Sequence, residues 1–79
     1  MSEKLSPASY VVGLKQSLKS IAAKKAKKVF LAADADFYIS AKVSDACADN
    51  GVDIEVSFTM EELGKMCKIE VGAAVVTIL

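Results

Sequence analysis

The sequence predicts an α/β fold, a three-layer α/β/α sandwich with a four-stranded mixed sheet. Segments with the apolar pattern of strands are separated by segments whose apolar residues recur at the spacing of helices. One strand-like segment is apolar throughout, which is typical of strands covered on both faces. Since parallel neighbours need a helical crossover, we expect a partly parallel sheet between helices.

The chain has 79 residues, which fits one domain, and we expect residues 1–79 to form it. Hydrophobic residues make up 53% of the chain, slightly above the ~45–50% that is usual for soluble domains. This content supplies a core and argues against disorder.

The first elements are short. Ser6-Pro7 is predicted to begin a short helix or turn, and Tyr10–Val12 to form a strand that Gly13 ends. A helix is expected from Leu14 onwards. Its inward face carries apolar residues at i, i+4, i+7 and i+8: Leu14, Leu18, Ile21 and Ala22.

The middle of the chain predicts a buried strand followed by a second helix. Residues 29–33 are continuously apolar, and Asp34-Ala35-Asp36 ends that strand. The helix is expected over residues 40–49, and Asn50-Gly51 ends it with a glycine suited to a left-handed cap. Its predicted inward residues are Val43, Ala46 and Cys47.

The last third predicts two further strands and a helix between them. Residues 52–56 alternate as a strand with one wetter face, and Thr59–Glu62 has the spacing of a capping box. Residues 69–73 are expected to form a small-residue loop, and residues 74–79 the last strand. The buried stripe of the third helix is Leu63, Met66 and Cys67.

Composition excludes several kinds of site. The chain has no histidine, the commonest general base and metal ligand, and therefore no Ser/His or Cys/His nucleophile pair. Cys47 and Cys67 lack metal-site or disulfide spacing, so we expect two buried, reduced thiols. No secretory signal or membrane span is evident, which favours a cytoplasmic protein.

The zero net charge conceals two unlike halves. Residues 1–28 carry seven lysines and one acid, a charge of +6, whereas residues 29–79 carry three lysines and nine acids, a charge of −6. All ten basic residues are lysine, so no arginine fork is available. The lysine-rich residues 24–28 fit either a nucleic-acid contact or a solvated helix end.

The first candidate site is Gly13–Lys19. Gly13 allows a sharp turn into a helix whose first N–H groups attract anions, while Lys15 and Lys19 share one face. Gln16 can donate to and accept from a base edge, and Ser17 lies in the same turn. The alternative is an ordinary amphipathic helix with a polar outer face.

Two further segments could carry function. Asp34 and Asp36 follow a buried strand, where open sheets bind ligands and where haloacid-dehalogenase-type phosphatases begin; capping and turn formation are the alternative. The segment from Ile69 to Ala74 could lay an apolar surface against an unstacked base, or simply enter a core strand.

The segments VVGLKQSLKSI, KVFLAADAD and MEELGKMCKIEVGAAV together resemble the kink-turn-binding ribosomal proteins of the archaeal "seven-Ae" and eukaryotic "thirty-e" type, and most nearly their short bacterial relatives. The resemblance covers residues 8–79 and implies an α/β/α sandwich. It also implies recognition of a sharply bent RNA duplex with tandem sheared G·A pairs and a flipped-out base.

The resemblance assigns a role to each matching position. Gly13 would be the tight turn. Lys15, Gln16 and Lys19 would face the G·A pairs and the nearby backbone, and Ser17 occupies a position where the family has Thr. Asp36 matches an acid near the flipped base. The loop that packs on this base matches Ile69, Glu70, Val71, Gly72 and Ala73.

Three residues depart from the family pattern: Leu14 stands in place of Asn, Phe37 in place of Pro, and Met60 in place of a Lys of a eukaryotic relative. They imply weaker or altered affinity. The sequence as a whole predicts a monomeric, non-enzymatic RNA-binding protein, ribosomal or ribosome-associated. Its expected partner is a structured RNA, ribosomal or riboswitch-like, with no DNA, membrane, metal or cofactor.

Two alternatives remain at this point. The chain could be an interaction module of the same fold without RNA binding, or an enzyme that handles phosphate with Asp34 and Asp36.

Overall fold

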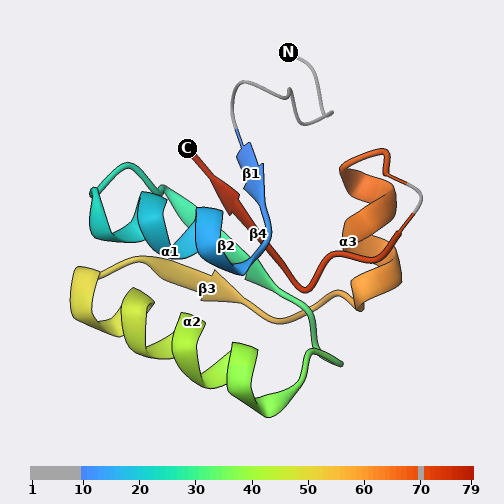
Figure 1. The fold of residues 1–79 in the computed structure, drawn as a ribbon, viewed down its shortest axis with the longest axis horizontal. Helices are drawn as coiled ribbons and strands as arrows, with labels where there is room; N and C mark the ends of the chain where they lie inside the picture. The colour runs from blue at the N-terminus through green and yellow to red at the C-terminus, as the bar shows by residue number, and fades with distance from the viewer. Residues whose placement is uncertain (1–9, 70) are drawn as a thin grey trace.

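The computed structural model describes residues 10–69 and 71–79, so the helix or turn expected at Ser6-Pro7 lies outside the described residues. Strands and helices alternate along the chain (Figure 1). Their bounds are β1 Tyr10–Val12, α1 Leu14–Ala22, β2 Lys28–Leu31, α2 Phe37–Asn50, β3 Asp53–Glu55, α3 Met60–Met66 and β4 Val75–Ile78.

The four strands form one mixed sheet in the order β1-β4-β2-β3. β2 and β3 are parallel, whereas β4 runs antiparallel to both β1 and β2. Val29 lies opposite Thr77 on one side and Ile54 on the other, so β2 and β4 occupy the centre of the sheet. The mixed sheet expected from the sequence is confirmed.

Two separate hydrophobic cores cover the two faces of the sheet. In the first, Ile21 of α1 and Val43 of α2 pack with Val75. In the second, Leu63 of α3 packs with the next residue of β4, Val76. Because neighbouring strand residues point to opposite faces, α1 and α2 cover one face and α3 the other, which confirms the three-layer sandwich (Figure 1).

Both middle strands differ from the sequence prediction at their ends. β2 spans Lys28–Leu31 rather than residues 29–33, because Ala33 turns away and donates its N–H to the Phe58 carbonyl at 2.8 Å. β3 is three residues long, and Val56 beyond it is 49% exposed. Within the described sheet, β3 pairs only with β2 and is therefore an edge strand.

Two details of the helices also differ. α2 begins at Phe37, three residues before the predicted start, because the Asp36 carboxylate caps it by accepting the Ile39 N–H at 3.0 Å. On α1, Ala22 is exposed rather than inward, and Ser17 is buried in its place.

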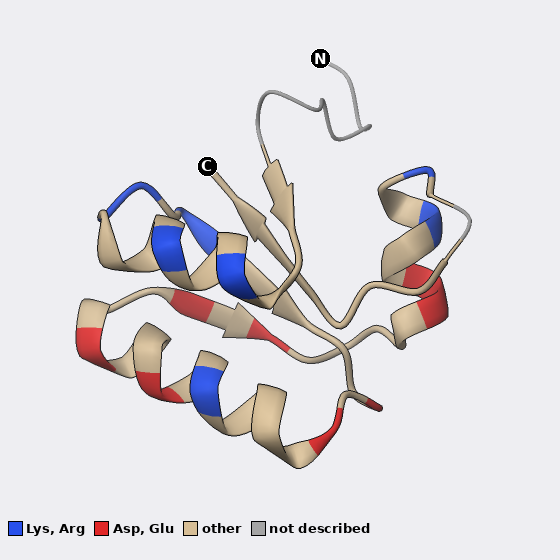
Figure 2. Cartoon of the chain, viewed as in Figure 1, with Lys and Arg blue, Asp and Glu red and all other residues tan. Residues whose placement is uncertain are grey.

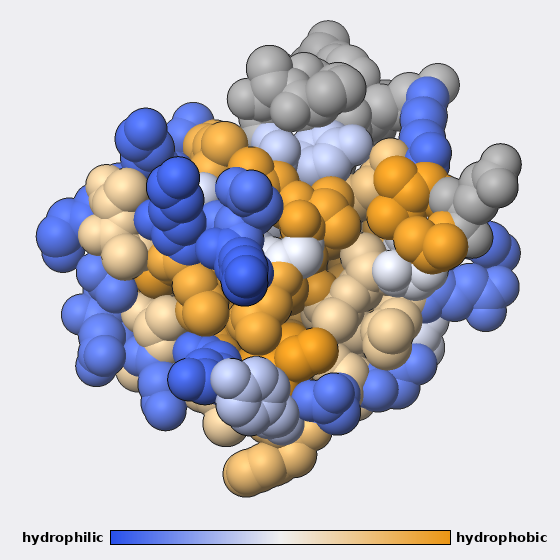
Figure 3. All heavy atoms as spheres, viewed as in Figure 1, coloured by the Kyte–Doolittle hydropathy of each residue, from blue (hydrophilic) through white to orange (hydrophobic). Residues whose placement is uncertain are grey.

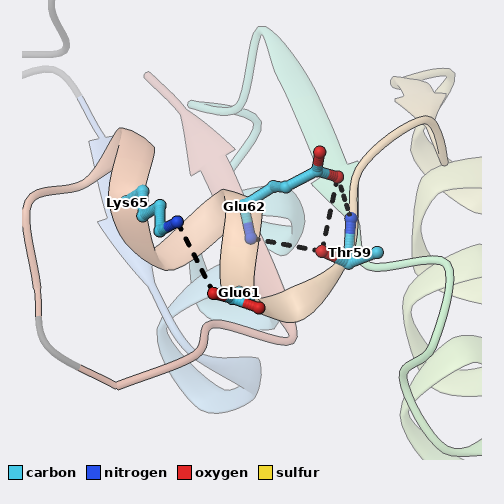
Figure 4. Close-up of polar contacts among 4 residues, drawn as sticks. All are labelled: Thr59, Glu61, Glu62 and Lys65. Atoms are coloured by element: carbon cyan, nitrogen blue, oxygen red, sulfur yellow. Dashed lines mark hydrogen bonds and ion pairs between the residues drawn. The ribbon is translucent and has the colours of Figure 1, made fainter.

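The two helix ends that the sequence predicted from capping residues, the end of α2 and the start of α3, are confirmed. Gly51 ends α2 in the left-handed conformation, at φ 65°. In the capping box of α3, the Thr59 N–H donates to the Glu62 carboxylate at 2.8 Å, and the Glu62 N–H donates to the Thr59 hydroxyl at 3.2 Å (Figure 4). These bonds fix where α3 begins.

Cys47 and Cys67 are free and buried, as expected. Removal from water raises the pKa of both thiols, because burial disfavours the charged thiolate. Both cysteines therefore act as small apolar core residues. Within residues 10–69 and 71–79, no helix combines the length and the apolar character that crossing a bilayer requires.

Candidate functional site

The first turn of α1 is fixed by Gly13. This residue has φ 108° and ψ 160°, a combination essentially restricted to glycine. Its N–H donates to the Val75 carbonyl at 3.0 Å, and its own carbonyl accepts the Ser17 N–H at 3.0 Å. The sharp turn expected from the sequence is confirmed, and it holds the start of α1 against the first residue of β4.

The exposed side of α1 carries the polar residues that the sequence singled out. Lys15, Gln16 and Lys19 are exposed, and neither lysine forms an ion pair with another described residue. Leu14 is half-buried against the first core. Ser17 is fully buried, and its hydroxyl has no hydrogen-bond partner among the described residues. Leu14 and Ser17 therefore pack beneath the exposed residues of α1.

The acidic segment caps two helices. Asp34 accepts the Met60 N–H at 2.8 Å, at the first residue of α3, while Asp36 caps α2. Both carboxylates thus have the capping role that was the alternative to a catalytic one. Among the described residues, no three histidine, cysteine or acidic side chains gather in a way that could hold a metal ion.

The loop before β4 presents apolar side chains to solvent, as expected. Ile69 is 37% exposed and Val71 is 70% exposed. Ala73 is buried instead, and its N–H donates to the Met60 carbonyl at 3.0 Å. Gly72 is exposed and lies beside Met60. The prediction for Glu70 lies outside the described residues.

Gly64 of α3 sets how closely this loop approaches the helix. A β-carbon at Gly64 would collide with the Val71 carbonyl. The absence of a side chain at Gly64 therefore allows the loop to lie directly on α3.

Hydrogen bonds bring these segments together at one end of the sheet. Gly13 bonds to Val75, and the Ala32 N–H at the end of β2 donates to the Ala74 carbonyl at 2.8 Å. Met60 joins Asp34 through its N–H to Ala73 through its carbonyl. The start of α1, the acidic segment and the apolar loop therefore surround the end of the sheet at which β4 begins (Figure 1).

The structure adds an aromatic pair that the sequence analysis did not include in the site. Phe37 and Tyr38, the first residues of α2, are 86% and 63% exposed. The Lys42 ammonium lies 5.3 Å from the centre of the Tyr38 ring. The sequence signal was Asp36, a residue type that often caps helices. With Asp36 as the cap, Phe37 and Tyr38 fall in the first turn of α2.

Charged and hydrophobic residues lie in neighbouring regions of the surface. Lysines lie along α1 and the turn after it, with others on α2 and at the end of α3, whereas acids lie on α2, on β3 and at the starts of α2 and α3 (Figure 2). Hydrophobic surface lies between hydrophilic regions in the same view (Figure 3). The arrangement offers cations, a helix N-terminus and exposed apolar side chains to one ligand.

Comparisons with known proteins identify the relatives of this chain. The model of the ribosomal protein L7Ae/L30e/S12e/Gadd45 family matches residues 1–79. An RNA-binding protein of Caldanaerobacter subterraneus is 44% identical over 68 residues, which cover 86% of this chain and 83% of that protein. An RNA-binding protein of Geobacillus thermodenitrificans is 45% identical over 69 residues, 87% of this chain and 84% of the relative.

Solved structures have the same fold. A Giardia lamblia 15.5 kD RNA-binding protein superposes with a TM-score of 0.84 and 32% identity, over 90% of this chain and 60% of that one. A Bacillus halodurans protein with unknown function also gives a TM-score of 0.84, at 20% identity, over 90% of this chain and 71% of that one. The resemblance inferred from the sequence motifs is thereby confirmed, and the chain belongs to the ribosomal protein L7Ae/L30e/S12e/Gadd45 family.

Proposed function

We propose that this chain is an RNA-binding protein that recognises kink-turn RNA, a bent duplex with tandem sheared G·A pairs and a flipped-out base. Support comes from the family to which the chain belongs and from relatives named as RNA-binding proteins. In this proposal residues 1–79 act as a single, monomeric, cytoplasmic domain, ribosomal or ribosome-associated. It performs no catalysis and needs no cofactor, DNA or membrane.

The start of α1 supplies the electrostatic part of the proposed binding. A sharp bend crowds phosphates together, and lysines lower the cost of that crowding by neutralising them. Lys15 lies in the first turn of α1, whose N-terminus also attracts anions, and Lys19 lies one turn further along, on the exposed side of the helix. Gln16 lies between them in sequence, and its amide can donate to and accept from the base edges that sheared pairs expose.

The loop before β4 supplies the apolar part. Val71 and Ile69 expose branched side chains on which an unstacked base can pack. Asp36 caps α2 through one carboxylate oxygen, Oδ1, at 3.0 Å from the Ile39 nitrogen. In this proposal its other oxygen, Oδ2, accepts a hydrogen bond from a base.

One observation carries the proposal above all others. The hydrogen bond between the Gly13 N–H and the Val75 carbonyl holds the polar start of α1 at the end of the sheet where the apolar loop enters β4. A single ligand at this end can therefore touch both surfaces. The alternative of phosphate chemistry has less support, because Asp34 and Asp36 both cap helices.

Binding to a matched pair of RNAs tests the proposal. The first RNA is a kink-turn, and the second is the same duplex with its G·A pairs replaced by Watson–Crick pairs. We expect the kink-turn to bind at least about fivefold more tightly, since one base-edge contact discriminates by roughly 1–3 kcal/mol. The measurement is fluorescence anisotropy with each labelled RNA at one salt concentration.

Equal affinity for the two RNAs would leave only nonspecific attraction between lysines and phosphates and would refute kink-turn recognition. No binding to either RNA would favour an interaction module of this fold that does not bind RNA. The enzymatic alternative is tested by assaying Mg²⁺-dependent hydrolysis of a phosphomonoester. Hydrolysis by the wild type that is abolished in Asp34→Asn would support it.

A further inference from the structure

A second group of lysines lies at the opposite end of the sheet from the candidate site. Lys24, Lys25 and Lys27 are exposed in the turn between α1 and β2, residues 23–27, which we call the basic turn. The Lys27 N–H donates to the carbonyl of Ile78, the last residue of β4.

The length of β4 separates this turn from the candidate site. The site is attached to the first residue of β4, Val75, through Gly13, and the turn to its last, Ile78. Three residue steps along a strand correspond to about 10 Å. α1 bridges the same gap, since its nine residues begin at the site and end at the turn (Figure 1).

Among the described residues, the lysines of the basic turn are not neutralised by ion pairs. Residues 10–28 contain six lysines and no acid. Lys28 pairs with Glu55 at 2.8 Å, and the Lys28 hydrogen bond lowers the pKa of that carboxyl. Within the described residues, the three lysines of the turn form no ion pair, and Lys24 donates only to the neutral Asn50 amide at 3.5 Å.

The backbone of the turn gives Lys24 no structural advantage over glycine. Lys24 has φ 61°, a left-handed conformation that glycine adopts without strain. The turn is closed by backbone bonds that a glycine would keep, from the Lys24 N–H to Ile21 and from the Lys25 N–H to Ser20, both at 3.0 Å. What the lysine adds at this position is its charge.

We propose that Lys24, Lys25 and Lys27 form a second RNA-binding surface, which holds the phosphate backbone of a regular duplex outside the bent segment. The inference rests on the proposed RNA-binding function and adds a second partner to it. The deep, narrow major groove of a regular RNA duplex hides its base edges from side chains, so these lysines contact phosphates without regard to sequence. The candidate site and the basic turn, at opposite ends of the sheet, would thereby hold two RNA segments on one domain.

The same residues argue against a membrane partner. Large apolar side chains that insert into a bilayer are absent from the turn, whose remaining residues are Ala23 and Ala26. The exposed large hydrophobic residues of the described chain lie elsewhere: Phe37, Tyr38, Val56, Ile69 and Val71.

The test adds a labelled Watson–Crick RNA duplex to wild-type protein that is already saturated with unlabelled kink-turn RNA. We expect a ternary complex whose duplex affinity falls with salt. The triple variant Lys24→Ala/Lys25→Ala/Lys27→Ala should keep its kink-turn affinity and bind the duplex much more weakly. Three lost phosphate contacts flatten the salt slope by about 2.7, so from 50 to 200 mM salt the wild-type affinity falls about 40-fold more than that of the variant.

Two further variants test whether a loss of duplex binding comes from the lysines of the basic turn rather than from a change in net charge or a loss of folding. Lys42→Ala/Lys65→Ala/Lys68→Ala removes the same charge from other surfaces and should leave duplex binding nearly unchanged. Lys24→Gly removes one charge and relieves the left-handed backbone, so the Tm should hold or rise while duplex affinity falls several-fold.

Several results would overturn the inference: equal loss of duplex binding in both triple variants, or kink-turn and duplex binding lost together in the first. Binding of the basic turn to phosphatidylserine vesicles but not to duplex RNA would also contradict it. A failure of the proposed function is distinguishable, because wild-type protein would then bind the kink-turn and the Watson–Crick duplex equally.

Discussion

Gly64→Ala is expected to destabilise the protein and to displace the apolar loop. The new β-carbon would collide with the Val71 carbonyl, which is backbone and cannot rotate away. Overpacking of this kind costs about 1–3 kcal/mol, and each 1 kcal/mol lowers the Tm of a small domain by roughly 4–8 °C. Thermal unfolding followed by circular dichroism measures the loss.

The matched control is Gly51→Ala, at the end of α2. Gly51 has φ 65° and no heavy atom within 4 Å of an added β-carbon, so the change strains the backbone without moving the loop. We expect both variants to lose stability, but only Gly64→Ala to lose kink-turn affinity below its Tm. Equal kink-turn affinity in folded Gly64→Ala and wild type would show that the position of Val71 does not matter for binding.

The double variant Lys15→Ala/Lys19→Ala is expected to lose most of its affinity for kink-turn RNA. Both side chains are exposed on α1, so their removal leaves the core intact. If each contacts one phosphate, counterion release predicts a loss of about 60-fold at 0.1 M salt, and a salt slope flatter by about 1.8. Anisotropy titrations at several salt concentrations measure both quantities.

Lys24→Ala/Lys25→Ala removes the same charge from the same half of the chain and serves as the control. Since these lysines lie in the basic turn, at the opposite end of the sheet from the start of α1, we expect kink-turn affinity within about twofold of wild type, far from the ~60-fold loss that two phosphate contacts imply. Unchanged affinity and slope in Lys15→Ala/Lys19→Ala would instead place the RNA-binding surface away from α1.

The elements that the sequence predicted correctly are those specified by local chemistry. Thr59 and Glu62 form the capping box, and Gly13 and Gly51 adopt backbone conformations that favour glycine. The predicted ends that were wrong depend on tertiary contacts. β2 stops at Leu31 because Ala33 bonds to Phe58, twenty-five residues away along the chain, and a local apolar pattern carries no information about such a bond.

The exposure of the predicted site residues was predictable only in part. Lys15, Gln16 and Val71 are exposed as the motif requires. Ser17 is buried because α1 packs on the sheet through that position, while Ala22 near the helix end is exposed. The exposed rings of Phe37 and Tyr38 were missed, because the predicted α2 began after them.

The central claim is that the start of α1 and the loop before β4 contact one RNA. Backbone amide NMR shifts of ¹⁵N-labelled protein, recorded while kink-turn RNA is added, test it most directly. We predict that the amides of Gly13–Gln16 and of Val71–Ala73 shift together, at the same RNA concentrations. Shifts confined to the basic turn, or to only one of the two segments, would contradict the account.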